Sequence, residues 1–292
     1  MEERSVVMRK LVGCVRKALT DYNMLEAGDH VAVGLSGGKD SLALLTALAI
    51  FKRFSPIPFE LSAITISLGL KETDPKEVQA LIDYCKELGV PYYIEETQIA
   101  QILFEERKEK NPCSLCSKMR RGALNTKCKE IGANKLALGH NSEDLLETFL
   151  LSFIYEGRLS TFQPVSHMER SDITLIRPFI YAREGDIKGV CNRLNLPILH
   201  NPCPMNHVTQ REYMKNLTMS ICKDIPFAKD RMFSAITNPE RYNLFPNKAT
   251  KKDDYAGRPL MSPALHEDCA TRGCSSPYAP RQTPPRHLAS GA

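Results

Sequence analysis

The sequence predicts an α/β protein in which helices cover both faces of a parallel sheet. Short apolar stretches of strand length alternate along the chain with longer segments of helical periodicity, an alternation typical of parallel sheets. Of the 292 residues, 42% are hydrophobic and 25% are charged, which is ordinary for a globular protein with one sizeable core. No apolar run reaches the roughly 18 residues needed to cross a bilayer, so we expect no membrane association.

The elements can be assigned in chain order. Residues 4–22 place apolar side chains at every fourth position and predict a helix. Asp74-Pro75-Lys76-Glu77 predicts a helix start, because it combines a carboxylate cap, a proline in the first turn and a glutamate three residues after the cap. Gly89 predicts the end of that helix. The predicted strands are 30–35, 59–68, 91–94, 135–139 and 173–176. The remaining predicted helices are 41–53, one ending near 131, 142–155, 183–194 and 209–223.

This pattern divides the chain into four segments. We expect an N-terminal helix at 1–24, the α/β domain at 25–225, a C-terminal helical segment at 226–246 and a disordered tail at 247–292. The tail is rich in Pro, Ser, Arg and Gly and has no apolar period.

Charge and cysteine content narrow the chemistry. The net charge is +5, and the residues from Pro246 onward contribute +3 of it, so any nucleic-acid contact of the nearly neutral body must come from local patches. The N-terminus lacks the apolar core of a signal peptide, which predicts a cytoplasmic protein. Ten cysteines in a reducing compartment indicate metal or redox work rather than disulfides.

The segment Ser36-Gly37-Gly38-Lys39-Asp40-Ser41 predicts a phosphate-binding loop. It joins a buried strand to a helix, so the helix N-terminus and the two glycines can bring backbone N–H groups to phosphate oxygens. Lys39 can neutralise phosphate charge, Ser36 and Ser41 can donate hydrogen bonds, and Asp40 is placed to hold Mg²⁺. The alternative is an ordinary glycine turn between a strand and a helix.

Cys113 and Cys116 form a Cys-x-x-Cys pair at the start of a predicted helix, where the helix N-terminus should lower the pKa of the thiols. The pair supplies half of a tetrahedral site. Cys203, between two prolines, is the best candidate for a third ligand, while buried structural cysteines are the alternative. Cys269 and Cys274 lie in the predicted tail and are weaker candidates for a metal site.

Taken together, these motifs resemble the PP-loop ATP pyrophosphatases, and within them the tRNA 2-thiocytidine synthetase branch. The resemblance spans roughly residues 25–220. It rests on five segments, which are Leu35 to Ser41, Cys113 to Gly122, Leu138 to Asp144, Ile176 to Phe179 with Glu184, and Asn201 to Pro204. Many members have a second Cys-x-x-Cys where this chain has Cys203 alone, and the tail has no counterpart in the family.

The resemblance implies a fold like that of the adenine nucleotide alpha-hydrolases, ATP and Mg²⁺ as cofactors, and a 4Fe–4S cluster held by Cys113, Cys116 and Cys203. It implies transfer of AMP to the O2 of a cytidine in the tRNA anticodon loop, at position 32, and displacement of the AMP by sulfur. The partners would be tRNA and a cysteine desulfurase or other sulfur donor, and a homodimer is compatible with the sequence. Asp144 would act as a general base or hold Mg²⁺, and His140 would line the nucleotide pocket.

Other interpretations remain open for the supporting residues. Asp144 and its neighbours Asn141 and Ser142 also suit a simple helix cap. Lys118, Arg120 and Arg121 are candidates for tRNA phosphate contacts, or else form a solvated basic face.

The alternatives for the whole protein are another PP-loop reaction, such as uridine thiolation or sulfur insertion into a small molecule, or a non-enzymatic nucleotide- or metal-binding regulator. Lysidine synthesis needs no paired cysteines, so Cys113 and Cys116 argue against it.

Overall fold

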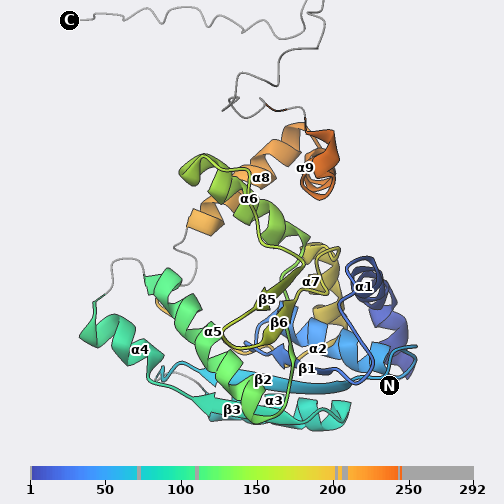
Figure 1. Ribbon diagram of the computed structural model, residues 1–292, viewed down its shortest axis with the longest axis vertical. Helices are drawn as coiled ribbons and strands as arrows, with labels where there is room; N and C mark the ends of the chain where they lie inside the picture. The colour runs from blue at the N-terminus through green and yellow to red at the C-terminus, as the bar shows by residue number, and fades with distance from the viewer. Residues whose placement is uncertain are drawn as a thin grey trace, which may run out of the picture. The chain divides into compact units, whose positions relative to one another are not determined.

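A computed structural model describes residues 2–70, 74–108, 112–200, 203–205, 210–242 and 244. Within these ranges, six strands form one sheet in the order β3-β2-β1-β4-β6-β5 (Figure 1). The strands are β1 His30–Gly34, β2 Glu60–Ser67, β3 Tyr92–Glu96, β4 Lys135–Ala137, β5 Val165–Met168 and β6 Ile173–Ile176. All neighbouring pairs are parallel except β5 and β6. The predicted fold is therefore confirmed, with one antiparallel edge strand added.

Helices cover both faces of this sheet. They are α1 Glu2–Asp21, α2 Lys39–Lys52, α3 Pro75–Leu88, α4 Ile99–Gln101, a π-helical turn η1 Ile102–Glu106, α5 Pro112–Glu130, α6 Ser142–Glu156, α7 Glu184–Leu194, α8 Gln210–Asp224, α9 Ala228–Thr237 and a 3₁₀ turn η2 Pro239–Arg241.

The alternation of side chains along β1 shows the two cores directly. Val31 and Val33 belong to one hydrophobic cluster with residues of α1, α2 and α7, whereas Ala32 belongs to a second cluster with α5 and β6. In a strand, successive side chains point to opposite faces of the sheet. The apolar period expected at the N-terminus is realised, since Leu11 and Val15 of α1 are fully buried in the first cluster.

The connectivity creates a switch point. From β1 the chain moves outward to β2 and β3, then returns to β4 on the other side of β1. The carboxyl ends of β1 and β4 therefore diverge into separate connections, and this is where ligands bind in open α/β sheets.

Some elements were not predicted. The strand β5, with the sequence Val-Ser-His-Met, has too few apolar residues to stand out, and α4 with η1 runs into the charged residues Glu105 and Glu106 without a clear helical period. Within the described ranges, no helix has the length and apolarity to cross a membrane. The segment boundaries proposed from the sequence stay predictions, and the expected tail at 247–292, with Cys269 and Cys274, lies outside the described residues.

Candidate functional site

The loop between β1 and α2 is folded by its own serines. Ser36 Oγ and Ser41 Oγ lie 3.1 Å apart, and Ser41 Oγ donates to the carbonyl oxygen of Gly38 at 2.9 Å. Gly38 is the N-cap of α2 and offers no side chain to the first turn. The helix start therefore keeps backbone donors and the positive end of its dipole directed at the loop. This is the arrangement that a phosphate group requires.

Gly37 joins this loop to the segment that leads to Cys203. Its φ of +77° is in the left-handed region, and a Cβ there would lie 2.4 Å from Leu199 Cδ1. The backbone N–H of Leu199 donates to the Gly37 carbonyl at 2.9 Å. Next along the chain, the N–H of His200 donates to Glu77 Oε2 at 2.9 Å. Glu77 thus accepts a hydrogen bond from the segment before Cys203. The side-chain cap of α3 is Asp74, which accepts from the N–H of Lys76.

Lys39 and Asp40 are already paired in the loop. Lys39 Nζ lies 2.6 Å from Asp40 Oδ2 and 3.2 Å from Glu184 Oε1. The other Asp40 oxygen accepts from Asn141 Nδ2 at 3.2 Å. Burial lowers the pKa of the Lys39 ammonium, but its two carboxylate partners outweigh burial and raise the pKa above the ordinary value. Lys39 is therefore a fixed positive charge at neutral pH.

The end of β4 packs directly on the start of α2. A Cβ on Gly139 would lie 2.9 Å from the backbone carbon of Asp40, so a side chain there would displace the phosphate loop. Asn141 then caps α6, accepting from the N–H groups of Glu143 and Asp144, while Asp144 Oδ2 accepts from the N–H of Asn141 at 3.0 Å. The helix-cap interpretation of Asp144 is thus realised in the structure. Burial raises the pKa of this carboxyl, and its second oxygen faces Arg211.

His140 is held as a neutral ring. It packs on Phe162, with ring centroids 5.0 Å apart, and its Nδ1 is buried with no hydrogen-bond partner in the described part of the chain. Burial is the main cause that lowers its pKa to about 3, and Arg177, Arg211 and Arg121 contribute. The imidazole therefore offers a hydrogen-bonding edge without charge at neutral pH.

Sequence reasoning missed the charged residues that α8 brings to the site. Arg211 lies 3.3 Å from Asp144 Oδ1 and 3.4 Å from Glu147 Oε2. Lys215, one turn later, lies 3.1 Å from Glu184 Oε1. Burial is the largest cause that raises the pKa of Glu147, to about 7. The i, i+4 spacing of Arg211 and Lys215 in a predicted helix was the available signal.

Glu184 is the centre of this charged group. Its Oε1 accepts from Lys39 at 3.2 Å, from Lys188 at 3.2 Å and from Lys215 at 3.1 Å. Burial alone would raise the pKa of Glu184, but the lysines together lower it to about 2. Glu184 lies in α7, far from the phosphate loop in the sequence. It therefore positions Lys39 of that loop through a tertiary contact.

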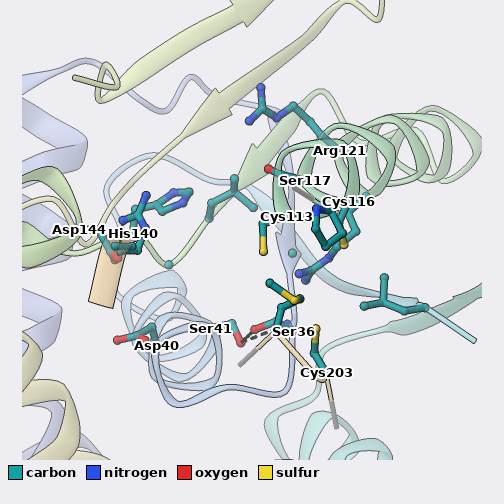
Figure 2. A pocket seen from close by; sticks show the side chains of 18 of the residues that line it. Ser36, Asp40, Ser41, Cys113, Cys116, Ser117, Arg121, His140, Asp144 and Cys203 are labelled. Atoms are coloured by element: carbon teal, nitrogen blue, oxygen red, sulfur yellow. Dashed lines mark hydrogen bonds and ion pairs between the residues drawn. The ribbon is translucent and has the colours of Figure 1, made fainter. Parts of the chain in front are cut away.

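These groups line one cavity of about 660 Å³ (Figure 2). In the view of Figure 2, Ser36 and Ser41 lie between the carboxylate of Asp40 and the thiol of Cys203. The sequence-predicted residues on its wall are Ser36, Lys39, Asp40, Ser41, Cys113, Cys116, Arg120, Arg121, His140, Asp144 and Cys203. Gly37, Gly38 and Lys118 are not among the residues on the wall.

The three thiols come from separate parts of the chain to the same wall. Cys113 and Cys116 lie in the first turns of α5, and Cys203 follows 87 residues after Cys116. Burial raises the pKa of Cys116, Arg120 opposes this effect, and the charges of Cys203 and Cys113 add to it. The predicted lowering of the thiol pKa by the helix N-terminus is therefore wrong for Cys116, because burial outweighs it.

The donor set suits a thiolate-bound metal centre, since three soft ligands face one cavity that has room for a cluster. Within the described residues, no three His, Cys, Asp or Glu side chains are close enough to hold a metal ion as they stand. Three flanking segments, 109–111 before Cys113 and 201–202 and 206–209 on either side of Cys203, lie outside the described residues. Binding would thus require the thiols to close on the metal.

Comparison with known proteins supplies the family. A family model described as a PP-loop domain matches residues 10–220. The chain belongs to this PP-loop family. The phosphate loop, and the end of β4 that packs on it at Gly139, are therefore parts of an ATP-binding domain.

Relatives narrow the branch. A tRNA-cytidine(32) 2-sulfurtransferase of Pelobacter propionicus is 36% identical over 235 residues, which cover 80% of this chain and 86% of that protein. One of the same name from Marinobacter nauticus is 38% identical and covers 83% of this chain and 80% of that protein. The predicted 2-thiocytidine synthetase branch is confirmed by these relatives.

A solved structure supports the same assignment. The U34-tRNA thiolase NcsA from Methanococcus maripaludis, with its [4Fe-4S] cluster, superposes with a TM-score of 0.66 at 26% identity. The match covers 82% of this chain and 80% of NcsA. The fold is thus that of a PP-loop tRNA thiolase.

Proposed function

We propose that this protein is an ATP-dependent tRNA sulfurtransferase, which replaces the O2 of cytidine 32 in the anticodon loop with sulfur. One observation carries the proposal: an ATP-binding phosphate loop and three cysteines line a single cavity, in a chain 36–38% identical to tRNA-cytidine(32) 2-sulfurtransferases. A nucleotide-binding regulator has no need of thiols on the wall of its nucleotide pocket.

Activation of the base would use the phosphate loop. The cytidine O2 attacks the α-phosphorus of ATP, pyrophosphate leaves, and the base oxygen becomes part of an AMP leaving group. The backbone donors of the loop and Lys39, held by Glu184, would balance the phosphate charge. Asp40 is the proposed Mg²⁺ ligand, which requires that its pair with Lys39 opens when the metal and ATP bind.

Sulfur delivery would use the part of the cavity wall that carries the three cysteines. We propose that Cys113, Cys116 and Cys203 hold a 4Fe–4S cluster, like the cluster named in NcsA. When bound, such a cluster would supply a site for the sulfide that replaces AMP, and the three thiols would hold the cluster. Free sulfide could supply the sulfur directly, whereas a cysteine desulfurase would deliver persulfide sulfur, which needs two electrons from a thiol reductant to be released as sulfide. A persulfide on one of the three thiols is the alternative carrier.

The surroundings of the cavity suit an RNA loop. Arg120 and Arg121 follow Cys116 on α5 and line the cavity, where they would contact phosphates beside the extruded base. The neutral edge of His140 would contact a base without competing for phosphate. We also propose a cytoplasmic location, because thiols that must bind a cluster stay reduced in that compartment.

An anaerobic reaction with defined tRNA transcripts tests the proposal. Protein reconstituted with iron and sulfide is mixed with ATP, sulfide and a tRNA that carries either C or U at position 32, and nucleosides are analysed by mass spectrometry. We expect 2-thiocytidine and AMP with the C32 transcript and neither product with the U32 transcript. Thiolation of uridine instead would favour the uridine reaction, and no thiolated nucleoside with any transcript would refute the proposal.

A further inference from the structure

A second groove, of about 880 Å³, lies apart from the ATP cavity, between α1 and the C-terminal end of α2. These two helices pack side by side (Figure 1). Its walls are formed by Ser5, Arg9, Val12, Gly13, Arg16, Ile50, Arg53 and Phe54. The ATP cavity is lined by a different set of residues.

A glycine forms a notch in the wall of the groove. A Cβ on Gly13 would meet no atom of the described residues within 4 Å, so packing does not explain the glycine. In the middle of a helix, glycine costs about 1 kcal/mol relative to alanine. Arg9 and Arg16 lie on either side of this notch, about 10 Å apart along the helix.

The arginines of the groove differ from the other basic residues of α1. Arg4, Lys10 and Lys17 are each paired with a carboxylate, namely Glu87, Asp186 and Asp21. Arg9, Arg16 and Arg53 are exposed and have no carboxylate partner among the described residues.

Phe54 completes this surface with a ring that is 57% exposed. The groove therefore combines an open notch and an aromatic face with three exposed guanidinium groups, and these guanidinium groups complement a phosphate backbone.

We propose that this groove binds backbone phosphates of the substrate tRNA, outside the segment held in the ATP cavity. The inference rests on the proposed function, because the tRNA is the polyanion that the enzyme must hold. The α2 helix runs from the phosphate loop to the groove over 14 residues, about 21 Å. A tRNA whose anticodon loop enters the cavity extends well beyond that distance. The near-neutral body of the protein makes such a local patch necessary for binding.

The test measures tRNA binding as a function of salt concentration for matched variants. One variant reverses the groove charges (R9E/R16E/R53E), and a second fills the notch without changing charge (Gly13→Gln). The control (K76E/K86E/R193E) reverses three exposed basic residues outside both cavities and changes the net charge by the same amount. Each protein is also assayed for thiolation and for its oligomeric state.

Removal of three arginine–phosphate interactions should lower the slope of log K against log salt by about 2 to 3, and weaken binding about 100- to 500-fold at 0.1 M salt. Gly13→Gln should bind with intermediate affinity and melt no lower than the wild type, since glutamine favours a helix more than glycine. Thiolation at saturating tRNA should persist in both groove variants.

Three results would overturn the inference. The first is that the groove variants bind tRNA like the wild type. This result would leave the proposed function intact if the wild type thiolates tRNA. An equal loss of affinity in the control would show an effect of net charge alone. A changed oligomeric state with unchanged tRNA binding would assign the groove to a second copy of the chain. A wild type that neither binds nor thiolates tRNA would instead refute the proposed function itself.

Discussion

Glu184→Gln is expected to destabilise the protein markedly at neutral pH, because the change leaves three lysines around an uncharged amide. The pKa of Glu184 is lowered from 4.5 to about 2. A difference of about 2.5 units corresponds to about 3 kcal/mol at about 1.36 kcal/mol per unit. Lys188 is 53% exposed, so solvent screens part of this energy. We therefore expect a loss of about 2 kcal/mol in the free energy of unfolding.

The pH dependence gives this prediction its sign. A depressed folded-state pKa contributes stability that is present above the unfolded pKa of about 4.5 and is lost as the pH falls through about 2. The difference between wild type and Glu184→Gln should thus be full at pH 7, begin to shrink below about pH 4.5, and fall to about half by pH 3.

Urea unfolding at a series of pH values measures both quantities. Glu60→Gln is the control, since the Glu60 side chain is 79% exposed and, among the described residues, pairs only with His30 at 3.8 Å. Its change should stay within about 0.5 kcal/mol. A Glu184→Gln protein as stable as the control at pH 7, or a difference that does not vary with pH, would refute the charge argument.

Three further variants test the two walls of the cavity. Cys203→Ser should lose iron and sulfide and stop thiolating while still binding ATP, and full cluster occupancy by metal analysis would contradict the three-cysteine site. Asp40→Ala should reduce tRNA-dependent AMP release at least about 100-fold while the protein stays folded, because the loop loses the proposed metal ligand; near-normal release would show that Asp40 is dispensable. Reversal of Arg120 and Arg121 should flatten the salt dependence of tRNA binding by about 0.7 to 0.9 for each phosphate that is no longer neutralised, and an unchanged slope would move the RNA away from α5.

Much of this architecture follows from the sequence, because strands and helices of the α/β core carry strong local signals. The Asp74-Pro75 start and the Gly89 end of α3 lie as predicted, with Gly89 in the left-handed conformation at φ +69°. The phosphate loop could be predicted in the same way, since its glycines and its place between strand and helix are local properties. β5 escaped prediction because its side chains are half polar and it pairs only with the edge of β6.

The charged support of the site could not be predicted, since it depends on tertiary contacts. Nothing local to Glu184 shows that lysines from α2 and α8 converge on it. The raised pKa of Cys116 likewise comes from burial and from Cys203, a distant residue. The Cys-x-x-Cys spacing and the prolines around Cys203 identified the cysteines, whereas only the fold shows that they share a cavity with Lys39.

If this cavity joins ATP activation to sulfur transfer at one base oxygen, that oxygen must leave with AMP, and an isotope experiment can follow it. A tRNA with oxygen-18 at the O2 of cytidine 32 is thiolated by the reconstituted enzyme, and the AMP is analysed by mass spectrometry. We expect one heavy oxygen in AMP for each 2-thiocytidine formed. Heavy oxygen in water or pyrophosphate, with unlabelled AMP, would contradict it.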